Sequence, residues 1–372
     1  MTATLDDLTA LFVRLAETPS PSGHERAVAD LIIGELRAAG VEVREDDSAP
    51  RTGAGAGNLV ARIAGRGKGT PVALCAHMDT VPLAGEVRVR IEDGVARSAG
   101  ETILGADDKA AVTALIALAR DLAAEPPAGD VEIVITAGEE VGLRGARQLD
   151  LGGLSAEAVF VFDSEGPVGT VVVSAPSLTK VIAGFHGRAA HAGIEPEKGR
   201  SAVLAAARAV AAMPLGRIDG QTTANVGLLA GGSAINVVPE RCRLEGEARS
   251  RDRDSLTVQL GRMIEAVNVA AAETGVDVTV TLEEDFVGFA LGRDALVVRL
   301  AAAALADIGV EPAYVGTGGG ADSNVFNANG LPAVNLGVGF ENVHSAQESI
   351  ALASLAQVYD LAHALVRVAG AA

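Results

Sequence analysis

The chain has 372 residues, more than the roughly 250–300 at which one hydrophobic core stops growing, so two domains are expected. Hydrophobic residues make up 49% of the sequence, which is enough to fill well-packed cores. The 30 Lys and Arg residues against 48 Asp and Glu residues give a net charge of -18. That balance argues against nucleic acid or an anionic membrane as the partner, because both would be repelled.

The N-terminal segment lacks the basic start and apolar core of a signal peptide. No apolar run in the sequence is long enough to cross a membrane. Cys75 and Cys242 each lie in a predicted strand, which indicates buried thiols and not a disulfide framework. We therefore expect a soluble, cytoplasmic protein.

The first part of the chain alternates helices and strands. Apolar periodicity predicts helices over 5–17, 24–39 and 108–123, and strands over 41–45, 57–64, 71–76, 131–136 and 158–162. Such β-α-β alternation favours a mixed or mostly parallel sheet covered by helices.

The pattern changes near residue 177. Strand, helix, two strands, helix and strand are predicted in turn, over 178–185, 199–213, 224–229, 242–250, 253–271 and 276–282. This βαββαβ order is that of the ferredoxin-like fold. After residue 288 the α/β pattern resumes, with a helix over 293–308, a strand over 333–336 and a last helix over 350–368. We therefore predict an α/β domain with a mixed sheet and flanking helices, built from residues 1–176 and 289–372, and an inserted ferredoxin-like α+β domain over 177–288.

Histidines and acidic residues follow the predicted strands of the α/β domain. His77, Glu140 and Asp163 come after the strands at 71–76, 131–136 and 158–162. His344 follows the strand at 333–336 after a Gly-rich turn, and Asp107 stands just before the helix at 108–123. Ligands of an open α/β sheet bind beyond the carboxyl ends of its strands, so these five side chains are expected to meet at one rim.

The residue types at this rim suit a pair of divalent metal ions that hydrolyse an amide bond. Each ion takes imidazole or carboxylate ligands, and one carboxylate must bridge the pair. Asp107 is the natural bridge, because a tight turn before a helix can aim both of its oxygens. Asp79, two residues after His77, is placed to orient the imidazole. Glu139, beside Glu140, is placed to carry a proton from the attacking water to the leaving amine.

Each of these motifs has a simpler interpretation when taken alone. A single His-x-Asp motif is weak evidence for a metal site, and a Glu-Glu pair is typical of a solvated turn. Two aspartates before a helix are typical of an N-cap and a first-turn acid, and a loop histidine can lie at the surface. The simpler interpretation requires all four motifs to fall by chance at strand ends or helix starts, beside almost wholly apolar neighbours. Their joint occurrence favours the metal centre.

Five segments carry a resemblance to a known family. In order along the chain, ALCAHMDTVP, LGADDKAAV, TAGEEVGLRGA, VFDSEG and VHSAQESI resemble the metal-site segments of the M20 metallopeptidase family. The run GTGGGADSNVFNANGLPAVNLGVGFENVHS is most similar to the peptidase T-like branch. The resemblance implies one metal ion at His77 and Asp163, a second at Glu140 and His344, and Asp107 as the bridge. It also implies a cis peptide bond at Asp107-Asp108. Zinc is the default metal, and nitrogen and oxygen ligands also admit cobalt or manganese.

The segment GFHGRAAHAGIEPEKGRSA of the inserted domain resembles the lid and dimerisation domain of the same family. The resemblance implies that His191 polarises the scissile carbonyl, that Asn236 and Arg249 contact the substrate, and that Gly320 belongs to a Gly-rich substrate loop. Asn236 can equally well be interpreted as a turn residue. Arg249 can equally well be interpreted as a charged residue on a strand surface. A homodimer through the inserted domain follows from the same resemblance.

The expected function is that of a two-metal exopeptidase, in the first place an aminopeptidase acting on short peptides. An N-acyl-amino-acid deacylase or a carboxypeptidase is the alternative within hydrolases, and it needs a cation such as Arg249 for the substrate carboxylate. A non-catalytic peptide-binding protein on the same scaffold is the alternative of another class. It is disfavoured because all five ligands and Glu139 are present.

Overall fold

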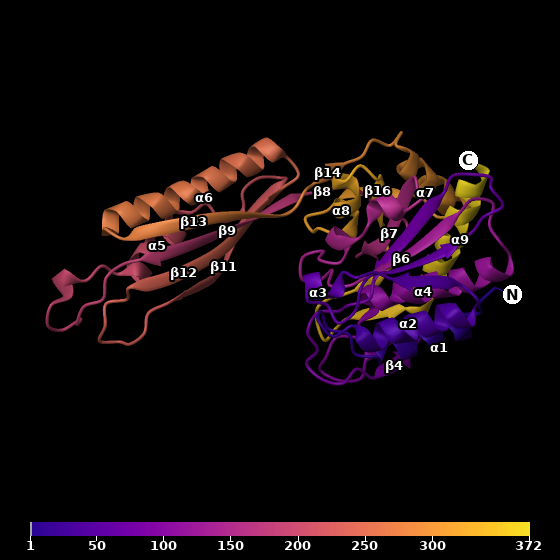
Figure 1. Ribbon diagram of the computed structural model, residues 1–372, viewed down its shortest axis with the longest axis horizontal. Helices are drawn as coiled ribbons and strands as arrows, with labels where there is room; N and C mark the ends of the chain where they lie inside the picture. Colours follow the sequence, from indigo (N-terminus) through magenta and orange to yellow (C-terminus); the bar gives the residue numbers. More distant parts are fainter. Residues whose placement is uncertain (1) are drawn as a thin grey trace. The chain divides into compact units, whose positions relative to one another are not determined.

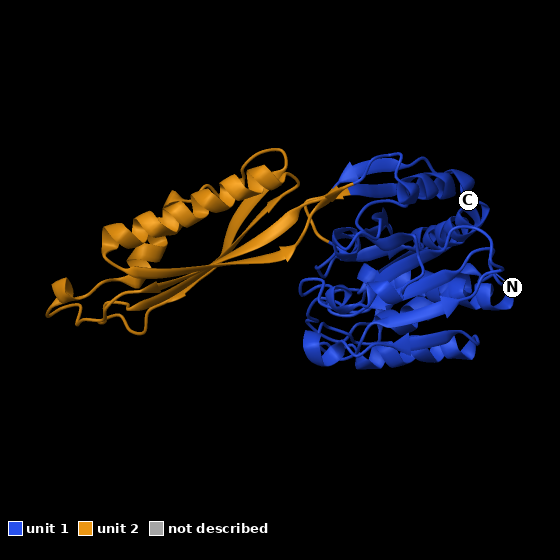
Figure 2. Ribbon diagram, turned by 45° about the horizontal axis from the view of Figure 1, so that its top comes forward, with its two compact units in different colours: residues 1–173, 291–316, 321–372 blue, residues 174–290, 317–320 orange. Residues whose placement is uncertain are grey.

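The computed structural model describes residues 2–372 and divides into two compact units. As Figure 2 shows, unit 1 comprises residues 1–173, 291–316 and 321–372, and unit 2 comprises residues 174–290 and 317–320. The predicted inserted domain, 177–288, falls within unit 2, and its exact boundaries remain a proposal. The sequence did not indicate that the short Gly-rich segment 317–320 returns to unit 2.

Unit 1 is built on a mixed sheet with the strand order β1-β2-β6-β3-β7-β16-β8. Figure 1 labels β6, β7, β16 and β8 of this sheet. The central strands β6, β3, β7 and β16 run parallel, and the strands outside them are antiparallel to their neighbours. Every residue of β3, β6 and β16 is buried, as expected of strands covered on both faces. The strands are β1 (Glu42–Glu45), β2 (Leu59–Ile63), β3 (Val72–His77), β6 (Val131–Thr136), β7 (Ala158–Ser164), β8 (Thr170–Ala175), β15 (Ala313–Gly316), which pairs with β8, and β16 (Ala333–Gly337).

Helices cover both faces of this sheet because successive side chains of its strands point in opposite directions. Leu74 and Phe160 pack into a core with α1, α2, α4, α7 and α9, whereas Cys75 and Val161 pack against Phe326 of α8 on the other face. The helices of unit 1 are α1 (Leu5–Ala16), α2 (Arg26–Ala38), α3 (Ala49–Thr52), α4 (Ala106–Ala124), α7 (Leu296–Asp307), α8 (Asp322–Ala328) and α9 (Leu352–Ala371), with short 3₁₀ turns at Ala146–Gln148 and Leu151–Gly153.

A second, small antiparallel sheet in unit 1 was not predicted. It has the order β17-β18-β5-β4, and it joins segments that are far apart in the chain, since Ile350 lies opposite Ala96. Its strands are β4 (Val89–Glu92), β5 (Val95–Ser98), β17 (Phe340–Glu341) and β18 (Ser349–Ala351). Runs of two to four residues leave little periodicity in the sequence, which is why these strands escaped prediction.

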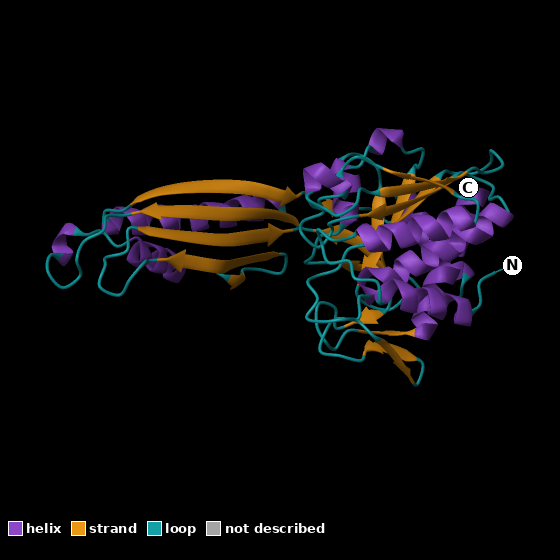
Figure 3. Cartoon of the chain, turned by 60° about the horizontal axis from the view of Figure 1, so that its bottom comes forward, coloured by secondary structure: helices purple, strands orange, loops and turns teal. Residues whose placement is uncertain are grey.

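Unit 2 is an antiparallel sheet in the order β10-β11-β12-β9-β13, and α5 and α6 pack on one of its faces (Figure 3). The order β11-β12-β9-β13, with helices after the first and third of these strands in the chain, is the predicted ferredoxin-like arrangement. The predicted fold class is therefore confirmed. The elements are β9 (Ser177–His186), a 3₁₀ turn at Pro196–Lys198, α5 (Ala202–Ala212), β10 (Gly216–Arg217), β11 (Thr222–Gly231), β12 (Arg241–Ser250), α6 (Arg253–Thr274) and β13 (Asp277–Phe286), followed by β14 (Phe289–Ala290), which pairs with the end of β8.

Two further predictions can be compared with the structure. Cys75 and Cys242 are free and buried, which confirms the prediction of two thiols. Across residues 2–372, no helix combines the length and the hydropathy that a membrane span needs.

Candidate metal centre

The parallel strands of unit 1 bring the predicted ligands to one rim. His77 is the last residue of β3, Asp163 is the last but one of β7, and Glu140 follows β6 in a turn. Asp107 is in the first turn of α4, and His344 lies in the loop between β17 and β18. Because β3, β6 and β7 run parallel, their carboxyl ends meet, as the sequence predicted.

The side chains form two groups that share Asp107. Its Oδ1 lies 3.2 Å from His77 Nε2, and its Oδ2 lies 3.3 Å from His344 Nε2. His77 Nε2 also lies 3.7 Å from Asp163 Oδ1, and His344 Nε2 lies 3.1 Å from Glu140 Oε1. The two oxygens of one carboxylate thus face two different imidazoles, and each imidazole faces a further carboxylate.

The backbone around Asp107 departs from the helix that it begins. Gly105 is left-handed, with φ 76°, and Asp107 itself has φ -79° and ψ 103°. The Asp107-Asp108 peptide bond is cis, as the family resemblance implied. Asp108 is not one of the predicted ligands, and its Oδ2 accepts a hydrogen bond from the backbone N–H of His77 at 3.1 Å.

Asp79 is fully buried and forms hydrogen bonds with His77, at the end of β3, and with the Glu139-Glu140 turn that follows β6. The His77 Nδ1 lies 2.9 Å from the backbone oxygen of Asp79 and 3.6 Å from its Oδ1. The Asp79 carboxylate accepts hydrogen bonds from the backbone N–H groups of Glu139 at 2.9 Å and Glu140 at 3.2 Å, and from Ser22 Oγ at 2.7 Å. Asp79 therefore orients the imidazole mainly through its backbone and holds the Glu139-Glu140 turn through its side chain.

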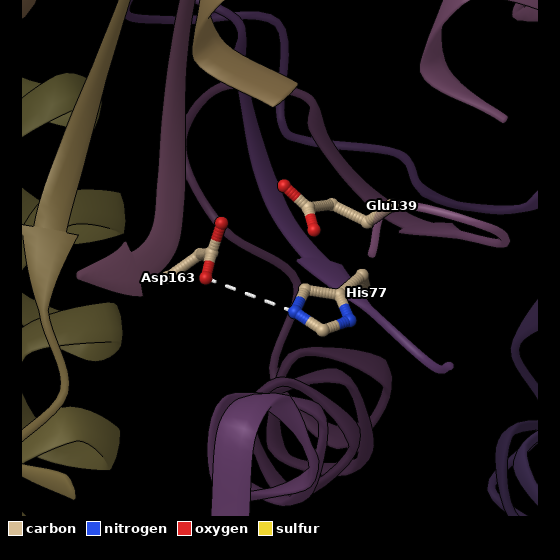
Figure 4. A group of neighbouring side chains, drawn as sticks. All are labelled: His77, Glu139 and Asp163. Atoms are coloured by element: carbon tan, nitrogen blue, oxygen red, sulfur yellow. Dashed lines mark ion pairs between the residues drawn. The ribbon is translucent and has the colours of Figure 1, made fainter. Parts of the chain in front are cut away.

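Glu139 lies beside the ligand atoms. One of its carboxylate oxygens, a His77 ring nitrogen and an Asp163 oxygen all lie within 4.8 Å of one another. Figure 4 shows the Glu139 carboxylate pointing toward Asp163 and His77, with the ion pair between those two residues dashed. A group at this place can reach a water molecule held between the ligands.

The electrostatics of the rim are those of an acidic cluster. Burial opposes the charge on Asp107, but hydrogen bonds from His344 and His77 lower its pKa to about 2. Burial raises the pKa of Asp163 to about 7 and raises the pKa of Glu139 well above its usual range. Hydrogen bonds to Asp107 and Glu140 raise the pKa of His344 to about 10. Burial opposes a positive charge on His77, but hydrogen bonds to Asp107 and Asp163 raise its pKa well above its usual range. Positive charge is therefore favoured at both imidazoles.

The donor set fits two divalent cations. Asp79 accepts the Nδ1–H of His77 in the tautomer that leaves the Nε2 lone pair toward Asp107 and Asp163. Lone pairs of imidazole and carboxylate that face one another in this way repel unless a proton or a cation lies between them. Two imidazole nitrogens and three carboxylates, with Asp107 between the two groups, are therefore candidate ligands for two divalent ions.

Two buried acids near the rim were missed by the sequence argument. Asp322, at the start of α8, accepts a hydrogen bond from Thr136 Oγ1 at 2.5 Å, and Thr136 ends β6. Glu348 accepts three backbone hydrogen bonds from the turn that precedes α4. Both lie inside segments that carry the family resemblance, Glu348 in VHSAQESI and Asp322 in the Gly-rich run that begins at residue 316. Their hydrogen-bond partners lie far away in the sequence, so the motifs alone assigned them no role.

The predicted substrate residues all lie in unit 2. His191 and Asn236 are exposed in neighbouring loops, joined by a hydrogen bond from Ala192 N to the Asn236 oxygen at 2.9 Å. Arg249 of β12 forms a two-pronged ion pair with Glu247, with nitrogen-oxygen distances of 2.8 and 3.1 Å, and also donates to the Gly318 oxygen at 3.4 Å. Gly320 lies against Phe286 so closely that a Cβ atom would come within 2.4 Å of the ring. The structure groups these four residues in one unit and leaves their roles as predictions.

Comparison with known proteins gives consistent matches. The model of peptidase family M20/M25/M40 matches residues 73–368. An uncharacterized protein of Bacillus subtilis, YqjE, is 38% identical over 95% of this chain and 96% of its own. The crystal structure of the aminopeptidase PepT from Bacillus cereus has 38% identity and a TM-score of 0.88, covering 98% of this chain and 99% of its own. The crystal structure of a tripeptidase from Staphylococcus aureus has 34% identity and a TM-score of 0.93, covering 100% of both chains.

The family match covers more than half of the sequence, and the aligned segment holds all five predicted ligands. The two solved structures cover 98% and 100% of this chain, so the matched residues include residues of both units. The predicted enzyme class, a metallopeptidase, is therefore confirmed. This chain is a member of peptidase family M20/M25/M40 and resembles its peptidase T-like members, as the sequence motifs predicted.

Proposed function

We propose that this protein is a two-metal exopeptidase that releases residues from the amino end of short peptides. The observation that supports a metal pair best is the position of Asp107, whose two oxygens lie 3.2 and 3.3 Å from two different imidazoles. A carboxylate that spans two sites in this way holds two like charges close together.

The ligands divide into two sets. His77 and Asp163 would hold one divalent ion, Glu140 and His344 the other, and Asp107 both. Zinc is the default, with cobalt or manganese as alternatives, since all the ligand atoms are nitrogen or oxygen. When bound, the two ions would polarise the scissile carbonyl and make the attacking water more acidic.

Glu139 and Asp79 would support the reaction without binding metal. Glu139 would take the proton of the attacking water at a carboxylate oxygen and pass it to the leaving amine, because its side chain lies within reach of the ligand atoms. Asp79 would keep both Glu139 and His77 in place through the hydrogen bonds already described. Its contribution is positional.

The choice between aminopeptidase and carboxypeptidase rests on Arg249. A substrate that ends in a carboxylate needs an available cation, but Glu247 binds this guanidinium with both of its oxygens. The pair is neutral, which favours a substrate with a free amine. The names of the two similar solved structures, an aminopeptidase and a tripeptidase, agree with that choice. An N-acyl-amino-acid deacylase is the second candidate, with Arg249 released from Glu247 as its requirement.

Unit 2 would serve as a lid and a dimerisation domain. We assign His191 to the scissile carbonyl, and Asn236 and the Gly320 segment to the substrate backbone. The strand β11 supports a homodimer, because its neighbour β10 is only two residues long and Leu228 and Leu229 are 45% and 46% exposed. A cytoplasmic location completes the proposal.

A single assay separates the candidates. The protein is loaded with zinc, cobalt or manganese and given a tripeptide with a free amine and the same tripeptide with an acetylated amine. We expect hydrolysis of the free tripeptide at its first bond, and little hydrolysis of the acetylated one. Release of acetate from the acetylated peptide would establish the deacylase, and loss of the last residue from either peptide would establish the carboxypeptidase. Hydrolysis of neither peptide with any metal would support the non-catalytic alternative.

A further inference from the structure

Glu348 is a buried acid whose carboxylate is surrounded by backbone donors. Its Oε2 accepts hydrogen bonds from the N–H groups of Leu104 and Gly105, both at 2.8 Å, and its Oε1 accepts one from Asp107 at 2.9 Å. The residue is 1% exposed. Three backbone donors on one carboxylate make a strong, directional contact, since hydrogen bonds to an ionised group are shorter and stronger than neutral ones.

The turn before α4 is shaped to receive this carboxylate. Successive backbone N–H groups converge on one point when a left-handed residue interrupts the chain, and the resulting concavity binds anions. Gly105 supplies that residue, with φ 76°, a conformation that other residues rarely adopt. The turn is therefore an anion site already filled by a side chain of the same protein.

A buried cation lies close to the same turn. Lys109 is 2% exposed, and its Nζ donates to the Thr18 oxygen at 2.7 Å. A Cβ atom placed on Gly105 would lie 3.8 Å from this Nζ. Burial lowers the pKa of Lys109 to about 7, and the neighbouring Glu348 carboxylate opposes that shift, so each of the two groups favours the charge of the other.

Glu348 also belongs to the segment that carries the second imidazole. It follows His344 by four residues, its backbone N–H donates to the Ser345 oxygen at 3.1 Å, and β18 begins at the next residue. His344 has φ 61°, so its backbone is held in a conformation that a non-glycine residue seldom adopts. One carboxylate therefore joins the turn of Asp107 to the loop of His344, although 241 residues separate Glu348 from Asp107.

We propose that Glu348 is a positioning residue that fixes the direction of the Asp107 carboxylate toward His77 and His344. It touches neither the substrate nor the ligand atoms, and it acts through the Asp107 backbone and the His344 loop. The inference rests on the proposed function, because its consequence is the affinity of the metal pair. Groups that orient metal ligands typically change metal affinity or activity by about 10- to 100-fold when they are replaced.

The test is Glu348→Gln in the full-length protein. The glutamine side chain has the same size, but its NH₂ group replaces one of the two oxygens that accept hydrogen bonds. At least one backbone N–H group of the turn then faces another donor. We expect zinc affinity, measured by competition with a chromophoric chelator, to fall about 10- to 100-fold. Turnover should recover toward the wild-type value when zinc is raised, because the Glu139 carboxylate is intact. A merely structural defect would not be rescued by metal.

The matched control is Glu132→Gln. Glu132 is equally buried and also accepts two backbone hydrogen bonds, from Ser155 at 2.9 Å and Ala156 at 3.1 Å, but it lies at the start of β6, opposite Ala73 of β3 and not His77. We expect this variant to keep the zinc affinity of the wild type. Equal loss of affinity in both variants would overturn the inference, because it would indicate general destabilisation.

Three further outcomes are decisive. If the wild type binds two zinc ions and Glu348→Gln binds them with unchanged affinity, the positioning role is wrong and the metal centre stands. If the wild type binds none, the proposed function fails and the inference fails with it. Should Glu348→Gln not fold, Glu348→Asp keeps the charge but is one methylene shorter. If Glu348 positions Asp107, Glu348→Asp should bind zinc more weakly while its unfolding temperature stays near that of the wild type. Unchanged zinc binding in Glu348→Asp would refute the positioning role.

Discussion

The two units treat their charged side chains in opposite ways. At the rim of unit 1, Asp79, Asp107 and Asp163 are buried or nearly so, and they face the imidazoles of His77 and His344. On the sheet of unit 2, Arg249 pairs with Glu247, Lys180 with Asp285 and Arg243 with Glu245. Unit 1 concentrates negative charge where it is costly, whereas unit 2 neutralises its charges in pairs at partly exposed positions.

The two units therefore differ in their need for a ligand. Acids that are buried together raise the free energy of the folded state unless protons or cations compensate them. The rim of unit 1 therefore gains from divalent ions, and the sheet of unit 2 needs no ligand for its own stability. Substitutions at the rim of unit 1 should therefore have larger effects than substitutions on the sheet of unit 2.

The largest effect is expected at Glu139. Glu139→Ala should lower turnover of a tripeptide by about 10²- to 10⁴-fold, because proton transfer to the leaving amine loses its carrier. Metal content should stay at the wild-type value by elemental analysis, because the five ligands are unchanged. Glu125→Ala, an exposed acid at the end of α4, is the control and should retain full turnover. Hydrolysis retained by Glu139→Ala would refute this mechanism.

Proton competition at His344 should give the next largest effect. The protonated imidazole cannot bind metal, and its carboxylate neighbours raise the pKa of His344 to about 10 in the metal-free protein. Metal must therefore displace a proton at every pH below that value, so apparent affinity should rise about tenfold per pH unit for each proton displaced. Zinc titrations at pH 6, 7 and 8 measure the slope. An affinity independent of pH would contradict this account.

In unit 2 the ion pair between Arg249 and Glu247 should have a smaller effect, which is on the choice of substrate. Glu247→Gln frees the guanidinium, which can then attract a substrate carboxylate. We expect the ratio of kcat/KM for an N-acetyl amino acid to that for a free tripeptide to rise several-fold, about 1 kcal/mol of discrimination. Arg249→Ala in the same background should cancel the gain. A ratio unchanged by Glu247→Gln would show that this pair does not select the substrate.

The smallest effect on stability is expected at the edge of β11. Leu228→Lys places a charge on an exposed strand edge, which blocks pairing with a second copy but should change the free energy of unfolding by at most about 0.5 kcal/mol. Sedimentation should show a dimer for the wild type and a monomer for the variant. Val315→Lys, an exposed apolar position in unit 1, serves as the control. A wild-type monomer would remove the dimer from the proposal.

Much of unit 1 could be predicted because its local signals agree with its tertiary structure. The apolar runs that became β3 and β6 end directly at His77 and before Glu139, so strand ends alone located the rim. The role of Glu348 could not be predicted, since its partners are backbone N–H groups 241 to 244 residues away and backbone donors leave no trace in sequence. The return of 317–320 to unit 2 was hidden for a similar reason, because packing such as that of Gly320 against Phe286 is purely tertiary.

If Asp107 bridges two metal ions, its removal should change the number of metal ions that each chain binds. The wild-type protein and Asp107→Ala are saturated with zinc, freed of unbound metal and measured by elemental analysis together with their protein concentrations. The account predicts two zinc ions per wild-type chain and a large loss of zinc in the variant, because both imidazoles lose the carboxylate that they share. Two full equivalents of zinc retained by folded Asp107→Ala would contradict it.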